Sequence, residues 1–110
     1  MVTIKSFRQL ALSLPDSIEL PHFEKSSFRV NKKIFATLDE HKTLACLMLT
    51  KNDQYVFSVF DNSIIYPVPN KWGLKGATFV ELNKVGKKML MDMIKLAYKK
   101  AAAKNPVKKK

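Results

Sequence analysis

The sequence from Leu20 to Leu38, LPHFEKSSFRVNKKIFATL, constrains the fold more than any other part of the chain. Two short runs at 26–30 and 34–39 flank the polar residues Asn31-Lys32-Lys33. Alternation of polar and apolar residues with a period of two is typical of half-buried strands, and a short polar segment between two such runs favours a tight turn. We therefore predict an antiparallel hairpin over residues 26–39.

Four more segments have the composition of strands. The segment Thr43–Thr50 is apolar at nearly every position, which predicts a central strand covered on both faces, or by helix on one. The segment Ile18–Phe23 is interrupted by Pro21, so we expect a loop or an edge strand there. A short strand at 64–66 and a last strand at 76–82 are predicted on either side of a loop that carries Lys71, Trp72 and Lys75.

Three segments have apolar residues at the spacing of amphipathic helices, namely Thr3–Leu14, Lys51–Phe60 and Asn83–Ala103. Thr3, Thr50 and Asn83 are the predicted N-caps because short polar side chains favour that position. The apolar side of the middle helix comprises Tyr55, Val56, Val59 and Phe60. The solvated side of the last helix comprises Lys88, Asp92, Lys95 and Lys99.

This order of elements predicts an α+β fold, a two-layer sandwich in which an antiparallel sheet has helices packed on one face. The 110 residues are enough for one modest core. We expect a single domain over residues 1–104, followed by a disordered lysine-rich tail over 105–110.

The net charge of +11 is distributed unevenly along the chain. From Lys84 to the end there are ten lysines and one acid, Asp92, which gives +9 and leaves +2 for residues 1–83. A segment of this kind attracts phosphate-rich polyanions. The excess charge is carried by lysine, which suits non-specific attraction better than bidentate reading of bases.

No residue pattern indicates catalysis or a cofactor. The two histidines, His22 and His41, have no partner at metal-ligand spacing, and the single Cys46 lies in an apolar run where we expect a buried, inert thiol. The sequence has three glycines and no glycine-rich phosphate loop. We predict a protein that is not an enzyme, has no metal or cofactor, does not span a membrane and is located in the cytoplasm.

The hairpin run and the later Lys71-Trp72-Gly73 resemble the MmcQ/YjbR family, whose members typically carry PHF-x-KPSFRV-x-xKIFATL and a tryptophan-glycine pair before a strand. The resemblance extends from Ile4 to Ala101, and this chain departs from it at Ser26, where the family often has proline. It implies a YjbR/CyaY-like fold, similar to frataxin and to secretion chaperones. It also implies DNA binding and no established catalytic residues. The family-typical positions are Lys25, Ser27, Phe28, Arg29, Lys33, Phe35 and Trp72-Gly73.

Three basic elements are candidates for contacts with DNA: Lys25, Arg29, Lys32 and Lys33 on the first hairpin; Lys71, Trp72 and Lys75 on the glycine loop; and Lys88, Lys95 and Lys99 on the last helix. Each has a plainer interpretation, since Trp72 can pack as a lid on the sheet edge and the lysines can simply solvate their elements. We expect weakly specific DNA binding through phosphates. The alternatives are a protein-interaction module that holds a peptide or a second copy, and a small-molecule pocket near His22, Arg29 and Trp72.

Overall fold

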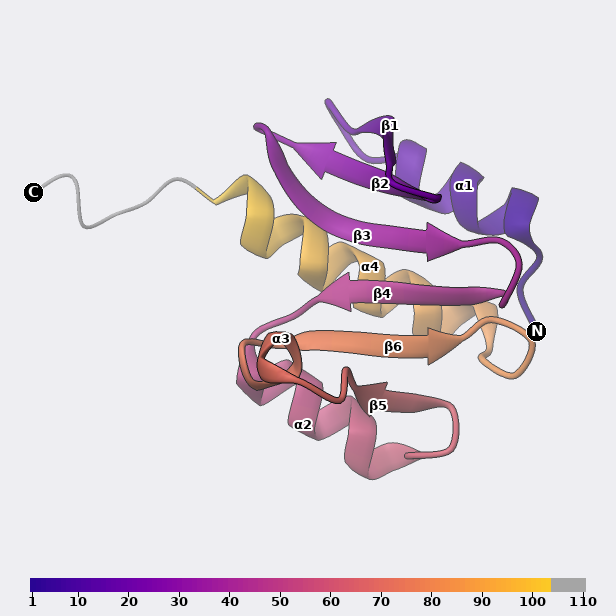
Figure 1. Ribbon diagram of the computed structural model, residues 1–110, viewed down its shortest axis with the longest axis vertical. Helices are drawn as coiled ribbons and strands as arrows, with labels where there is room; N and C mark the ends of the chain where they lie inside the picture. Colours follow the sequence, from indigo (N-terminus) through magenta and orange to yellow (C-terminus); the bar gives the residue numbers. More distant parts are fainter. Residues whose placement is uncertain (104–110) are drawn as a thin grey trace, which may run out of the picture.

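The computed structural model describes residues 1–103, so the tail expected at 105–110 lies outside the described residues. Six strands form one antiparallel sheet in the order β1-β2-β3-β4-β6-β5 (Figure 1). The strands are β1 (Ile18–His22), β2 (Lys25–Val30), β3 (Lys33–Asp39), β4 (Leu44–Met48), β5 (Ile65–Pro67) and β6 (Ala77–Glu81). The helices are α1 (Ile4–Leu12), α2 (Lys51–Phe60), α3 (Lys71–Leu74) and α4 (Lys87–Ala102).

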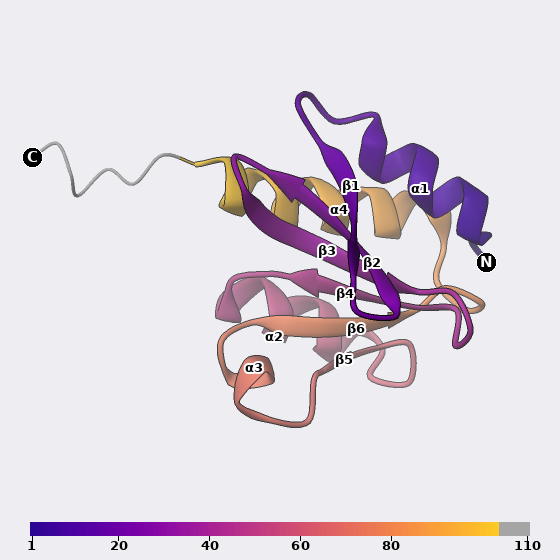
Figure 2. The same cartoon turned by 45° about the horizontal axis from the view of Figure 1, so that its top comes forward.

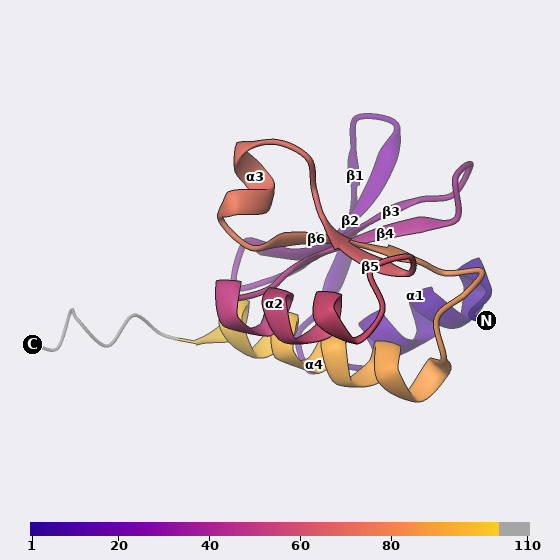
Figure 3. The same ribbon diagram turned by 90° about the horizontal axis from the view of Figure 1, so that it is seen from below.

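The helices α1, α2 and α4 cover one face of the sheet, while the short α3 lies on the other side (Figure 3). The predicted α+β, two-layer architecture is therefore confirmed. Of the loop and the edge strand that the sequence allowed for the segment from Ile18, the structure has the edge strand. None of the helices within residues 1–103 combines the length and the apolar character that crossing a bilayer requires.

The core lies between the sheet and α4. Aromatic pairs join the two layers: buried Phe7 of α1 meets buried Phe28 of β2 edge-on at 5.5 Å, and buried Phe35 of β3 meets half-buried Tyr98 of α4 edge-on at 5.7 Å. Such edge-on pairs add about 1 kcal/mol each beyond the burial of apolar area. Along β4 buried residues alternate with half-buried ones, so this central strand is covered by helices on one face only.

The N-caps of the first two helices are confirmed. The Thr3 hydroxyl accepts a hydrogen bond from the Ser6 amide at 3.0 Å, and the Thr50 hydroxyl accepts one from the Asp53 amide at 3.1 Å. The predicted cap at Asn83 is wrong, because α4 begins at Lys87 after Gly86. The Asn83 amide instead donates to the Thr43 hydroxyl at 2.8 Å. The Asn83 side chain therefore bonds to a residue distant in sequence and does not cap the helix.

The face of the sheet opposite the three helices is open. Paired residues form a row across it, from Ser27 through Thr37, Cys46 and Phe79 to Tyr66. Cys46 is half-buried there, not enclosed as expected from its apolar run. Burial of that thiol raises its pKa, which disfavours the reactive thiolate.

Candidate nucleic-acid interface

The direction of the strands gives the molecule two chemically different ends. The β2–β3 turn, the start of α2, α3 and the last turn of α4 all lie at one end (Figures 1 and 3). The β1–β2 and β3–β4 turns and the start of α4 lie at the other. We call the first the cationic end, and its positive residues are Arg29, Lys32, Lys33, Lys51, Lys71, Lys75, Lys99 and Lys100.

The β2–β3 turn holds two of these lysines in a fixed position. Asn31 and Lys32 have φ angles of 51° and 67°, as expected for a two-residue hairpin turn that follows the twist of its strands. The Asn31 side chain donates to the Ala102 carbonyl at 3.2 Å, which joins the turn to the end of α4 (Figure 2). Lys32 and Lys33 consequently lie near the lysines of the last turn of α4, where cations also complement the helix dipole.

Arg29 extends the cationic end onto the open face of the sheet. Its Nε donates to the hydroxyl of Ser27 at 3.0 Å, and that buried hydroxyl donates to the Leu20 carbonyl at 3.0 Å. Within residues 1–103 no carboxylate lies within salt-bridge distance of the Arg29 guanidinium. The chain therefore holds a half-buried guanidinium at a fixed angle without neutralising it, an arrangement suited to an anionic ligand.

The expected loop at 67–75 contains the short helix α3, which presents an exposed aromatic ring between two lysines. Asn70 caps this helix by accepting from the Trp72 amide at 2.8 Å. The Trp72 side chain is 54% exposed, so it is not a lid closed onto the sheet edge. The Lys75 ammonium lies 5.4 Å from the centre of that ring. An exposed aromatic ring beside cations can stack on a base or a sugar.

Two contacts hold α3 tightly in place. The Gln54 side chain of α2 donates to the carbonyls of Gly73 at 2.9 Å and Ala77 at 3.0 Å. A Cβ atom at Gly73 would lie 1.8 Å from the Val68 carbonyl oxygen, so only glycine permits this close approach. The position of Trp72 and its flanking lysines is thus fixed by its surroundings.

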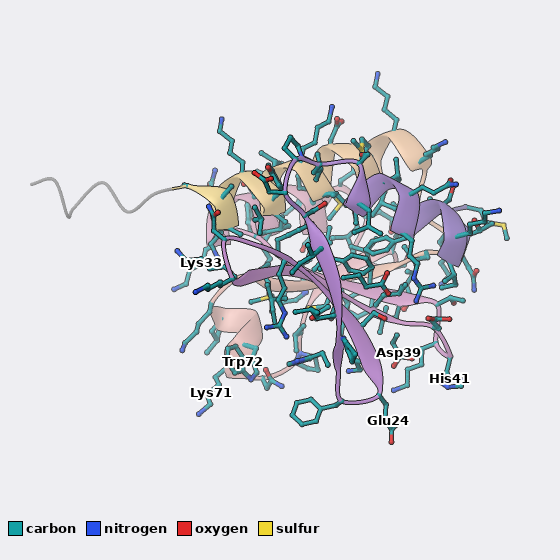
Figure 4. All side chains as sticks on the ribbon, turned by 90° about the horizontal axis from the view of Figure 1, so that it is seen from above. Glu24, Lys33, Asp39, His41, Lys71 and Trp72 are labelled. Atoms are coloured by element: carbon teal, nitrogen blue, oxygen red, sulfur yellow. The ribbon has the colours of Figure 1, made fainter. Side chains whose placement is uncertain are left out.

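We call the opposite end the acidic end, because the carboxylates of Glu24, Asp39 and Glu40 lie there, although lysines at positions 25, 42, 87 and 88 lie there as well. Glu24, Asp39 and His41 cluster there, away from Lys33, Lys71 and Trp72 (Figure 4). A hollow of about 340 Å³ at this end is lined by Phe23, Glu24, Lys25, Ser26, Leu38, Glu40 and His41. Arg8 is paired with Glu19 and Glu40, and both carboxylates raise its pKa.

The structure therefore brings together only part of the set predicted from the sequence. Arg29, Lys32, Lys33, Lys71, Trp72, Lys75 and Lys99 lie at the cationic end. Lys25 begins β2 beside Glu24, about 13 Å along the strand from Arg29. Lys88 lies in the first turn of α4, about 16 Å along the helix from Lys99, and Lys95 lies between them on the helix-covered side.

Sequence reasoning missed Lys51 and Lys100. Lys51 starts α2 directly after β4, and β4 ends on the same side as the β2–β3 turn. The antiparallel order of the strands was therefore the signal that could have found it. Among the described residues, no three His, Cys, Asp or Glu side chains gather where they could hold a metal ion.

Comparisons with known proteins identify the fold. Solved structures to which this chain is similar include protein DR2400 of Deinococcus radiodurans, with a DUF419 domain, and a protein from Pseudomonas syringae. The Deinococcus protein has a TM-score of 0.79 and 21% sequence identity, and the match covers 99% of this chain and 87% of that one. The Pseudomonas protein has a TM-score of 0.68 and 17% sequence identity, and the match covers 91% of this chain and 99% of that one. Neither the protein-family models nor the curated protein sequences contain a match. This chain thus shares the fold of a DUF419 domain.

Proposed function

We propose that this protein binds DNA through its phosphates, with weak sequence preference, and that the cationic end is the contact surface. The observation that carries the proposal is the gathering of eight cations from four separate elements at that end. Within residues 1–103 the only salt bridges are those of Arg8, so none of the eight is neutralised by a partner. We also propose kinship with the MmcQ/YjbR family, which the hairpin motif supports.

Phosphate binding would draw its free energy mainly from the release of counterions. A surface that neutralises four to eight phosphates should show an affinity that falls steeply with salt, with a slope of about −0.9 per phosphate on duplex DNA. Arg29 and Trp72 would add positional contacts at the border between this end and the open sheet face.

The proposal is tested with two variants that change the net charge equally. In K32E/K33E two lysines of the β2–β3 turn are reversed, whereas in K87E/K88E two exposed lysines at the acidic end are reversed. We expect K32E/K33E to weaken duplex binding at least about tenfold and to reduce the salt slope by about two. The control should lose less than about threefold, because its charges lie farther from the bound phosphates than a Debye length of about 8 Å. Fluorescence anisotropy at several salt concentrations measures both quantities.

A chain ending at Asn105 completes the test, since it lacks Lys108, Lys109 and Lys110. Binding that persists in this shortened chain supports a site on the domain. Equal losses in the two double variants would show that only bulk charge matters. Loss of all binding on shortening would assign the interaction to the last residues.

A further inference from the structure

The helix α2 turns its most apolar side to the outside. Its exposed large side chains are Tyr55 at 69%, Val56 at 54%, Val59 at 65% and Phe60 at 69%, and no residue of this helix is fully buried. At 100° per residue these four positions occupy an arc of about 140°. The apolar side predicted from the sequence exists, but it does not face the core.

The inward side of α2 is fixed by polar contacts. Gln54 donates to the Thr78 hydroxyl at 3.2 Å as well as to the carbonyls of Gly73 and Ala77. Phe57 packs against the core from the same side. Turning the apolar arc inward would break all three hydrogen bonds and would leave buried polar groups unpaired. The outward apolar face is consequently a fixed feature of the fold.

A hollow continues this apolar face toward α3. It encloses about 500 Å³ and is lined by Lys51, Gln54, Tyr55, Pro67, Val68, Pro69, Asn70, Gly73 and Leu74. Leu74 at its rim is 73% exposed. A contiguous apolar surface of this kind on a small domain marks a site of association.

The charges around α2 favour a second copy of this chain as the occupant. The net charge of +11 makes copies of this chain repel one another overall. The α2 segment carries one cation, Lys51, and two acids, Asp53 and Asp61, so it is an apolar surface through which two copies can approach without net repulsion. Because Lys51 begins the helix and Asp61 ends it, an antiparallel pair sets each lysine against the opposite carboxylate.

We propose that the chain forms a two-fold symmetric dimer through antiparallel packing of α2 on α2. The two-fold axis passes near Val56 and Val59, and Phe60 of each copy lies opposite Tyr55 of the other, at the mouth of the hollow. An interface of this type uses the same surface on both copies. Opposed helix dipoles also favour the antiparallel arrangement.

Sedimentation velocity on the full chain, from about 10 µM to about 1 mM, tests the proposal, because the fraction of a reversible dimer rises with protein concentration by mass action. The wild type should shift from monomer to dimer within that range. V56E/V59E should raise the dissociation constant more than about 100-fold by placing four carboxylates in the interface. The matched control L12E/I18E alters two apolar residues that are exposed elsewhere, and it should dimerise as the wild type does. Circular dichroism melting establishes that each variant is folded.

A charge cycle tests the antiparallel arrangement itself. K51Q and D61N should each weaken the dimer about two- to fivefold, and the double variant should be no weaker than either one, because both remove the same ion pair. D61N retains an Oδ1 that can accept the hydrogen bonds of Ser63. Additive effects would exclude this pairing. A wild type that stays monomeric at every concentration, including one that binds only a different protein, would overturn the dimer.

Discussion

At Gly76 the backbone adopts a φ of +112°, in a region that L side chains rarely occupy. A Cβ atom there would lie 1.9 Å from the Leu49 carbonyl oxygen. The Gly76 carbonyl also accepts a hydrogen bond from the Leu49 amide at 3.1 Å, so β6 and the end of β4 meet at this residue. The same junction positions α3, which directly precedes it.

We expect G76A to lower the free energy of unfolding by at least about 2 kcal/mol, since the side chain adds both backbone strain and a clash with Leu49. The control is G86S, because Gly86 has no atom within 4 Å of its Cβ direction and a serine there can cap α4. Urea unfolding measures the free energy of unfolding of both variants. A G76A protein as stable as the G86S protein would contradict the close approach.

Arg29 shows what the sequence can and cannot predict about a site residue. Its spacing of four from Lys25 puts both side chains on the same face of β2, and the sequence suggested a shared site on that basis. The structure separates them along the strand, so that one lies at the acidic end and the other at the cationic end. Periodicity identifies the face of a strand, but only the positions of neighbouring turns show which charges meet.

At the scale of elements, the edge strand β5 is joined to β6 by side chains as well as by backbone pairing. The Tyr66 hydroxyl donates to the Glu81 carboxylate, and the Tyr66 ring meets Phe79 edge-on at 5.9 Å. The hydrogen bond to Glu81 raises the pKa of Tyr66 to about 12. A raised folded-state pKa stabilises the fold below the ordinary tyrosine value and loses that effect as pH rises toward 12.

Y66F should therefore be less stable than the wild type by about 1 kcal/mol at pH 7. The difference should stay constant up to about pH 9 and shrink as the pH rises beyond about 10, where the unfolded-state tyrosine ionises. Chemical denaturation of both proteins from pH 7 to pH 11 measures this difference in the free energy of unfolding. As a control, Y55F alters an exposed tyrosine on α2. A Y66F difference that does not depend on pH would contradict a role for the hydroxyl.

Most element types follow from the sequence, and the exceptions have local causes. The hairpin, the helices and the two N-caps Thr3 and Thr50 depend on neighbours along the chain, which patterns describe well. The predicted N-cap at Asn83 is wrong because its side chain bonds to Thr43, which is distant in sequence. The orientation of α2 was not predictable either, since it depends on three acceptors that Gln54 finds on other elements.

At the scale of the whole molecule, the central feature is the difference between the cationic end, where eight cations gather, and the opposite end, where carboxylates and lysines are mixed. The chain carries +11, and its described salt bridges both belong to Arg8 near the acidic end. Because α2 begins at the cationic end, an antiparallel dimer would direct its two cationic ends away from each other. Such a dimer would be able to hold two segments of DNA at once.

The most direct test of the cationic end is an NMR titration of the ¹⁵N-labelled chain with a short DNA duplex. We predict that the largest amide shifts fall at Asn31–Lys33, Lys71–Lys75 and the last turn of α4, while Glu24 and Asp39–His41 remain unchanged. Those segments are distant in sequence and are joined only by the fold. Shifts centred on the acidic end, or confined to residues 104–110, would contradict the account.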